Sequence, residues 1–311
     1  MFDIVTFGEC MVRFSTPGGV MLEQAERLRA DPAGTESNVA VALARLGARS
    51  TWLSALPDNP IGRWMAERIA AHGVDVSHVV WTRDRAGIFF LEAGSPPRGS
   101  RVVYDRADSA VSRLTPEMID WAFVTDTRLL HLSGITPALS ESCRDIVVRA
   151  LTAARGRGCM TSFDINYRAK LWSPEQAASV LSPMLGMVDI LISTVSDIRL
   201  LFGFEGSPDE MIERVQTRFH NRTVVLTLSE GGAVGWSEET GLLRTGAHPV
   251  ERVDRLGAGD AFDAGLLWGL LRGDLAGGLA AGAALASLSH AEHGDVTWAT
   301  AAEVARLAGR S

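Results

Sequence analysis

The sequence predicts an α/β protein built on a doubly wound, mainly parallel sheet with helices on both faces and a small additional group of strands. Short apolar runs, typical of buried strands, alternate with longer amphipathic segments that are typical of helices. The 311 residues, 46% of them hydrophobic, are enough to bury one large core. Two stretches that break the alternation look like short strands joined by polar turns, and these predict the additional group.

The main sheet is expected from short apolar runs rich in β-branched and large aliphatic residues. These predicted strands are residues 4–7, 51–55, 129–132, 161–165, 190–193 and 224–228. The predicted helices are residues 36–46, 62–71, 140–155, 175–181 and 261–271. Repeated strand–helix units predict parallel strands covered on both faces.

The additional strands are expected in residues 11–28 and 86–105, with the clearest turn at residues 95–100. We find no linker, internal repeat or low-complexity segment in the sequence that would divide the chain. We therefore expect a single domain over residues 1–311, with these two segments inserted in it.

Charge and hydropathy exclude several classes of protein. A net charge of −7 argues against a nucleic-acid partner, because nucleic-acid binders usually carry a basic surface. The first residues lack the basic region of a signal peptide, and the apolar stretch over residues 256–291 is interrupted by charges such as Asp263 and Arg272. We expect a cytoplasmic protein with no membrane partner.

Lysine and glycine usage excludes three other nucleotide-binding classes. Lys170 is the only lysine, and Leu171 follows it, whereas a P-loop needs Lys followed by Ser or Thr. A protein kinase also needs a lysine on a strand beside the phosphates. A dinucleotide-binding turn would need three glycines after the first strand, where only Gly8 stands.

The sulfur and imidazole side chains do not form a metal-binding pattern. Cys10, Cys143 and Cys159 are scattered without the spacing of a zinc site or a disulfide framework, and we expect them to pack as small apolar residues. The histidines also lack the spacing of metal ligands.

Residues 254–262 combine an anion-binding turn with an acid. Gly257, Ala258 and Gly259 precede a helix-like apolar run, so their backbone N–H groups could stabilise a phosphoryl group during transfer. Asp260 follows directly, where a carboxylate could accept the proton of an attacking hydroxyl. The alternative is that Asp260 only caps the helix and the glycines only form a tight turn.

This segment resembles the C-terminal signature of the ribokinase-like (PfkB) family of carbohydrate kinases, Asp-Thr-x-Gly-Ala-Gly-Asp-x-Phe. Residues 33–40 resemble the family's N-terminal motif, and residues 57–62 resemble its Gly-x-Asp-x-x-Gly turn. Two separate motifs in the right order are more specific than one. Ala33 and Pro57 replace family glycines, and Arg255 replaces a small residue.

Within this family, two arginines resemble those of 2-keto-3-deoxygluconate kinases. The family resemblance implies that residues 11–28 and 86–105 form a small β lid that closes over the sugar. Arg106 lies at the end of a lid strand, and Arg168 closes an Asp-x-Asn-Tyr-Arg motif. The resemblance implies that both face an acidic sugar, whose carboxylate matches the bidentate geometry of a guanidinium. Taken alone, each arginine would more often form a surface ion pair.

The resemblance also implies further contacts to the sugar. Gly34, Asn38 and Tyr104 would position its hydroxyls, and Phe89 would line the site where the subgroup often has tyrosine. Residues 293–300 resemble the same subgroup, in which we expect this segment to have a structural role.

The nucleotide side is expected at the loop over residues 227–233, where the resemblance implies that Thr227, Ser229 and Gly232 contact ATP together with Gly257 and Gly259. An ordinary hairpin turn is the alternative for this loop. Asp197 stands in for a family acid that organises Mg²⁺ through water, and Thr194 replaces the amide of that motif. Activation by a monovalent cation is common in the wider family, but no site for one can be assigned in this sequence.

We therefore expect a kinase that transfers the γ-phosphoryl group of ATP to an acidic keto-sugar, with Asp260 as the base. A neutral substrate such as fructose, ribose or adenosine is the first alternative. A catalytically inactive sugar- or nucleotide-binding regulator is the second, because fold alone does not determine function. We also expect a homo-oligomer, although the motifs do not distinguish the gluconate substrate from its galactonate epimer.

Overall fold

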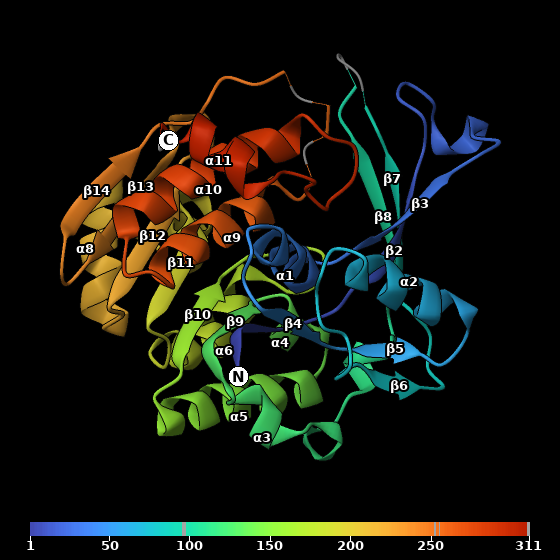
Figure 1. Cartoon of the computed structure of the whole chain (residues 1–311), viewed down its shortest axis with the longest axis horizontal. Helices are drawn as coiled ribbons and strands as arrows, with labels where there is room; N and C mark the ends of the chain where they lie inside the picture. The colour runs from blue at the N-terminus through green and yellow to red at the C-terminus, as the bar shows by residue number, and fades with distance from the viewer. Residues whose placement is uncertain (95–97, 252, 255, 310–311) are drawn as a thin grey trace.

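The computed structural model describes residues 1–94, 98–251, 253–254 and 256–309, and its largest element is an eight-stranded sheet (Figure 1). The strand order is β14-β13-β12-β11-β10-β9-β1-β4. The six strands β12, β11, β10, β9, β1 and β4 pair in parallel with their neighbours. At the other edge, β13 pairs with β12 and β14 pairs with β13, both antiparallel. The strands are β1 (Phe2–Phe7), β4 (Ser50–Leu53), β9 (Thr127–Ser133), β10 (Met160–Asp164), β11 (Ile190–Thr194), β12 (Thr223–Thr227), β13 (Ala233–Ser237) and β14 (Gly241–Thr245).

The fold class is confirmed, and the six expected strands are the six parallel ones. One of them is shorter than predicted: β4 ends at Leu53, and the chain continues as β5 (Ala55–Pro57), which pairs with β6 (Val80–Thr82) in a separate small sheet. The hairpin of β13 and β14 was not predicted. Exposed and half-buried residues alternate along β14, so this edge strand lacks the continuous apolar run of a buried strand.

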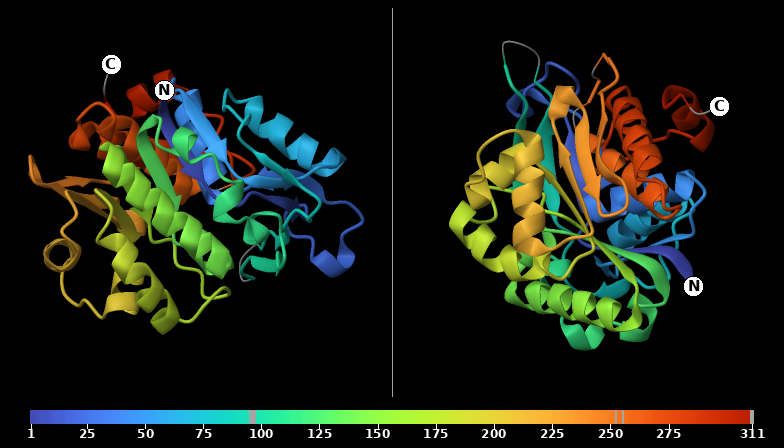
Figure 2. Two further views of the ribbon diagram at one scale, coloured as in Figure 1. Left: turned by 90° about the horizontal axis from the view of Figure 1, so that it is seen from below. Right: turned by 90° about the vertical axis from the view of Figure 1, so that its left-hand side faces the viewer.

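Helices cover both faces of the main sheet, as Figure 2 shows in its right-hand view. The first face packs against α1 (Thr35–Arg45), α9 (Ala258–Leu270), α10 (Leu275–His290) and α11 (Ala301–Leu307). The second face packs against α5 (Glu141–Arg157), α6 (Pro174–Leu185), α7 (Val195–Phe202) and α8 (Pro208–Phe219). The other helices are α2 (Pro60–Ala70), α3 (Trp121–Val124) and α4 (Thr136–Leu139).

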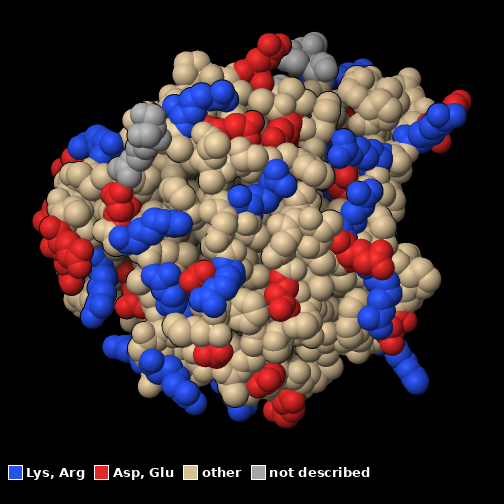
Figure 3. All heavy atoms as spheres, viewed as in Figure 1, with Lys and Arg blue, Asp and Glu red and all other residues tan. Residues whose placement is uncertain are grey.

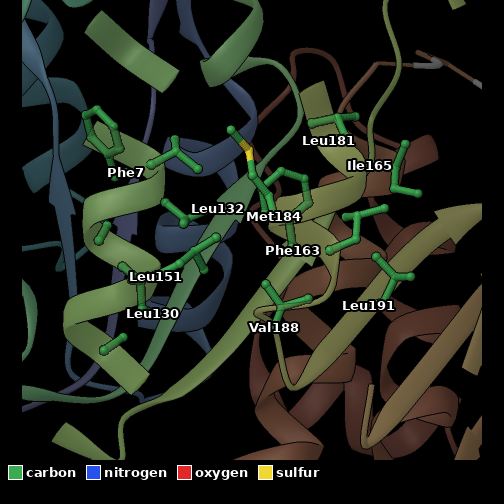
Figure 4. Packing of buried hydrophobic residues seen from close by; sticks show 14 of the residues in the cluster. Phe7, Leu130, Leu132, Leu151, Phe163, Ile165, Leu181, Met184, Val188 and Leu191 are labelled. Carbon is green, nitrogen blue, oxygen red and sulfur yellow. The ribbon is translucent and has the colours of Figure 1, made fainter. Parts of the chain in front are cut away.

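The core on the second face shows why these segments fold together. Leu130 and Leu132 of β9 and Phe163 of β10 are fully buried against Leu151 of α5 and Leu181 of α6 (Figure 4). Strand residues pointing to the opposite face pack on α1, α9 and α10. The parallel strands are therefore buried on both sides, which explains their continuous apolar runs.

Six helices of the described residues were not predicted: the short α3 and α4, and α7, α8, α10 and α11. The four longer ones carry recognisable local signals. α8 and α11 each begin with a capping box, formed by Ser207 with Glu210 and by Thr300 with Glu303. α7 and α10 begin at side-chain caps from Thr194 and Asp274, respectively. These caps were the available evidence for the missing helices.

The predicted lid segments lie in a second sheet, with the strand order β3-β2-β7-β8, which stands beside the main sheet and is called the lid below (Figure 1). Its strands are β2 (Met11–Ser15), β3 (Arg29–Ala33), β7 (Ile88–Glu92) and β8 (Arg101–Asp105). β3 lies beyond the predicted segment 11–28. Of the turn predicted at residues 95–100, residues 95–97 lie outside the described residues.

On the face drawn in Figure 3, basic and acidic side chains are interspersed. The surface of the protein also carries exposed ion pairs such as that of Arg199 with Glu205. Cys10, Cys143 and Cys159 are buried thiols without disulfide bonds, as expected for packing residues. In the described part of the chain, no helix combines the length and the apolar character needed to span a membrane.

Candidate active site

A cavity of about 260 Å³ lies at the carboxyl ends of the parallel strands, between the main sheet and the lid. Open α/β sheets usually bind ligands at this edge. Residues after β1 and β10 and at the ends of β11 and β12 line it, together with residues of the lid and of the two helices that begin there, α1 and α9. The predicted site residues that line the cavity are Gly34, Asn38, Phe89, Tyr104, Arg106, Arg168, Asp197, Thr227, Gly257, Gly259 and Asp260.

Asp260 lies in the first turn of α9, with 8% of its surface exposed. Asn38 of α1 donates from Nδ2 to its Oδ2 atom at 2.7 Å. Burial raises the pKa of Asp260 to about 8, and the negative charges of Asp295 and Asp164 add to this, whereas Asn38 and Arg168 oppose it. A carboxylate with such a pKa is a strong proton acceptor once it is ionised.

The turn before Asp260 requires a glycine at one position. Gly257 is the N-cap of α9 and has a φ of 82°, a left-handed conformation that glycine adopts without strain. A Cβ atom at this position would lie 2.1 Å from the carbonyl oxygen of Asp295. At Gly259, by contrast, a Cβ atom would meet nothing within 4 Å, because this residue faces the cavity.

The turn is held from the lid by a buried arginine. Arg13 of β2 pairs with both Asp254 and Asp295, and its Nε atom donates to Ser15 at 2.7 Å. Asp254 also accepts the N–H groups of Leu256 and Gly294. These contacts connect the lid sheet to the segment that precedes α9. Arg255 itself lies outside the described residues.

Helix α1 supplies the opposite wall of the cavity. It begins after Gly34, where a Cβ atom would lie 2.1 Å from the carbonyl oxygen of Glu9. Glycine is therefore needed for close packing against the segment that follows β1. Asn38, in the first turns of α1, is buried, and the hydrogen bond from its Nδ2 atom to Asp260 links α1 to α9.

The lid contributes an aromatic pair and an arginine. Phe89 of β7 and Tyr104 of β8 pack with ring centroids 5.6 Å apart. Arg106 follows β8 and donates to Oε2 of Glu9 from Nε at 2.8 Å and also from Nη2. Arg106 thus reaches the cavity as expected, but a buried carboxylate already engages part of its guanidinium.

Arg168 lies at the other side of the cavity, after β10, and its side chain is exposed. Asn166 precedes it with a φ of 43°, and its Nδ2 atom donates to Asp164 at 2.6 Å. This turn directs the chain from the end of β10 toward the cavity. Arg168 lies close enough to lower the pKa values of Asp164 and Asp260 by its charge.

Three further carboxyl groups line the cavity: Asp164 at the end of β10, Asp263 of α9 and Asp197 of α7. Burial raises the pKa of Asp164 to about 6 and raises that of Asp263 strongly, and each is raised further by neighbouring acids. Burial also raises the pKa of Asp197, which lines the cavity at the start of α7. Within the described residues, no three His, Cys, Asp or Glu side chains are arranged to hold a metal ion. The carboxylates fit Mg²⁺ as oxygen ligands that would share it with phosphate oxygens and water.

The predicted nucleotide loop is only partly at the cavity. Thr227, at the end of β12, lines it, whereas Ser229 and Gly232 do not. Gly232 has a φ of 87°, and a Cβ atom there would lie 2.0 Å from the carbonyl oxygen of Thr245. Its glycine is thus explained by the hairpin between β12 and β13. Thr194 caps α7 through the N–H of Asp197.

Sequence reasoning missed several charged residues of this region. Five acids that were not predicted as site residues line the cavity: Glu9, Glu36, Asp164, Asp263 and Asp295. Arg13 holds Asp295, which belongs to the segment for which only a structural role was expected, so that expectation was incomplete. Glu9 is an acid two residues after a predicted buried strand, and this position indicated its role.

The sequence matches the pfkB family of carbohydrate kinases over residues 1–301. It is 40% identical to a 2-dehydro-3-deoxygalactonokinase of Haloferax volcanii, covering 98% of this chain and 96% of that protein. It is 32% identical to a 2-dehydro-3-deoxygluconokinase of Bacillus subtilis over 86% of this chain and 83% of that protein. The crystal structure of a 2-dehydro-3-deoxygluconokinase from Thermotoga maritima superposes with a TM-score of 0.94 at 33% identity, covering 99% of this chain and 98% of that one. The chain therefore belongs to the pfkB family of carbohydrate kinases.

Proposed function

We propose that this kinase transfers the γ-phosphoryl group of ATP to a hydroxyl of 2-keto-3-deoxygluconate or of its galactonate epimer, giving the 6-phosphate. The observation that carries the proposal is one cavity lined both by the Gly257–Asp260 turn and by the arginines Arg106 and Arg168. The turn suits phosphoryl transfer, and the arginines suit an acidic acceptor. A neutral sugar would gain little from two guanidinium groups.

Asp260 is proposed to accept the proton of the attacking hydroxyl, while Asn38 orients its carboxylate. Backbone N–H groups at Gly257, Ala258 and Gly259 would stabilise the charge that develops on the transferred group, because the first N–H groups of a helix lack partners within it. Arg168 and the remaining donors of Arg106 would hold the sugar carboxylate. Gly34, Tyr104 and Phe89 would shape the sugar side.

ATP is proposed to bind along Thr227, Gly257 and Gly259, with Ser229 and Gly232 shaping the loop behind it. Mg²⁺, when bound, supplies positive charge that neutralises the phosphates. Asp197 and Asp164 are the carboxylates that would hold it, directly or through water. The lid would exclude water, which otherwise competes with the sugar as phosphoryl acceptor.

The test is ADP release with Mg²⁺ and ATP, with and without potassium, against a panel of acceptors. The panel contains 2-keto-3-deoxygluconate, its galactonate epimer, gluconate, fructose, ribose and adenosine. We expect turnover of the keto-deoxy acids only. Turnover of a neutral sugar alone would overturn the acidic substrate, and sugar binding without any turnover would favour a regulator. The cytoplasmic location and the homo-oligomeric state remain predictions, which fractionation and light scattering test.

A further inference from the structure

A buried acid on the sugar side of the cavity has no role in the mechanism above. Glu9 follows β1, and its side chain is only 1% exposed. Its Oε2 atom accepts both hydrogen bonds from Arg106. Its Oε1 atom is also buried, and no described residue donates a hydrogen bond to it.

The backbone at Gly87, in the lid, packs closely against this unpartnered oxygen. An added Cβ atom there would lie 2.9 Å from Glu9 Oε1 and 3.3 Å from Cβ of Arg106. Any larger residue there would press on the Glu9–Arg106 pair. The glycine thus leaves the pair undisturbed at the cavity wall, which Glu9 and Arg106 both line.

An unpartnered buried acceptor is costly, by about 1–3 kcal/mol and more for a charged group. A bound ligand that donates a hydrogen bond would remove this cost. A carboxylate can only accept hydrogen bonds, and it repels the carboxylate of an acidic sugar. The group that suits Glu9 Oε1 is therefore a hydroxyl of the sugar.

From this geometry we infer that Glu9 is a specificity-determining residue, which accepts a hydrogen bond from a non-reacting hydroxyl of the sugar acid through Oε1 and positions Arg106 through Oε2. The inference rests on the proposed function. The inference also orients the substrate in the cavity. The non-reacting hydroxyl lies next to Oε1 of Glu9. The carboxylate lies next to Arg168 and to those N–H groups of Arg106 that do not bind Glu9.

The experiment removes the hydroxyl and the acceptor separately and together. The kcat/KM value is measured for 2-keto-3-deoxygluconate and for its analogues lacking the C4 or the C5 hydroxyl, in the unchanged protein and in Glu9→Ala. In the unchanged protein, we expect one analogue to lose at least about tenfold, because a hydrogen bond to a charged group contributes about 1.5–3 kcal/mol. In Glu9→Ala, the same analogue should lose less than about threefold relative to the complete sugar.

Glu9→Gln is the second variant, in case the alanine variant does not fold. It keeps the size of the side chain but removes the charge, and neutral hydrogen bonds are about half as strong as charge-assisted ones. The penalty for the missing hydroxyl should then fall at least about threefold. Glu23→Gln is the matched control, because Glu23 also pairs with a lid arginine, Arg101, at 2.8 Å, but lies at the surface. Its kinetics should not change.

The inference is overturned if the penalty for the missing hydroxyl is the same in a folded Glu9 variant as in the unchanged protein. The same holds if neither analogue is penalised at all, because water would then satisfy Oε1. These results differ from a failure of the proposed function, in which the unchanged protein would not phosphorylate the complete keto-deoxy acids.

Discussion

At the scale of single residues, Asp260 combines burial with a position at the end of a helix that favours negative charge. Its pKa of about 8 arises because burial outweighs the contacts from Asn38 and Arg168. The side chain can therefore hold a proton at neutral pH and release it within the range where kinases operate. Two predictions follow from this one side chain, and a third concerns its neighbour Arg168.

Asp260→Asn should lower turnover by at least about 100-fold, because a general base contributes about 10²- to 10⁴-fold. The variant should still bind ATP, since the backbone N–H groups of the turn are unchanged. Turnover and ATP affinity are measured together, with circular dichroism as the check on folding. Near-normal turnover would remove Asp260 from its role as base.

The same substitution should change how stability depends on pH. Between pH 4 and 8 the native state keeps a proton on Asp260 that the unfolded chain has lost. The free energy of unfolding therefore falls as pH rises through this window. Asp260→Asn has no such proton, so its stability relative to the unchanged protein should rise by more than about 1 kcal/mol from pH 5 to pH 8. Urea unfolding at both pH values measures the difference, and a constant difference would contradict the prediction.

Arg168→Ala should raise KM for the keto-deoxy acid by about tenfold or more, because a hydrogen bond to a charged group is worth about 1.5–3 kcal/mol. Because losing the positive charge of Arg168 raises the pKa of Asp260 further, the assay is made at several values from pH 7 to pH 9, and the increase in KM should appear at each of them. Arg222→Ala is the control, since the side chain of Arg222 is 75% exposed. An unchanged KM in Arg168→Ala would mean that Arg168 has only a structural role.

At the scale of elements, the start of α9 contains two glycines that serve different purposes. Gly257 allows a left-handed turn against Asp295, whereas Gly259 has the backbone of an ordinary helical residue with open space beside it. Substituting Gly257 tests what the turn needs in order to fold, whereas substituting Gly259 tests whether the turn binds the nucleotide.

Gly257→Ala should destabilise the protein by more than about 1–3 kcal/mol, the usual cost of a strained backbone conformation, because its Cβ atom would also clash with the carbonyl oxygen of Asp295. Gly259→Ala should leave stability unchanged or raise it by up to about 1 kcal/mol, because alanine is the better helix former. It should nevertheless weaken ATP binding, since its Cβ atom would project into the cavity. Thermal unfolding and ATP titration of both variants test this, and equal ATP affinity in Gly259→Ala would remove that residue from the nucleotide site.

At the scale of the whole molecule, the lid and the helical side of the sheet meet through buried charges. Arg13 is 3% exposed, comes from the lid strand β2, and pairs with Asp254 and Asp295 from the C-terminal part of the chain. Burial alone would raise the pKa of Asp254, but Arg13 reverses this and lowers it. The position of the lid relative to the turn that precedes Asp260 therefore depends on the guanidinium group of Arg13.

Arg13→Met should cost about 3–5 kcal/mol of stability, because it leaves buried carboxylates without their partner. The loss should be smaller at low pH, where these carboxylates become protonated. Arg199→Met is the control, since Arg199 forms an exposed pair with Glu205 and should cost less than about 1 kcal/mol. Denaturant unfolding measures both, and similar losses in the two variants would refute the buried network.

Three features were determined by the sequence alone: the parallel strands of the main sheet, the glycine-containing turn at residues 257–259 with Asp260 after it, and membership of the pfkB family. Each of these is encoded locally, either as the apolar run of a strand buried on both faces or as a short motif whose residues are adjacent in the chain. The edge strand β14 escaped prediction because half-exposed residues interrupt its apolar pattern. The capping boxes at the starts of α8 and α11 are also local sequence patterns, so these two helices could have been predicted from the sequence.

Only the tertiary structure decided which charges meet. Glu9 and Arg106 are 97 residues apart in the chain, and Arg13 and Asp295 are 282 apart. No local pattern indicates such pairs, because each depends on how the lid sheet stands against the carboxyl edge of the main sheet. Asp260 could be identified as a base from its motif, but its raised pKa follows from burial and from acids distant in sequence, which exist only in the folded chain.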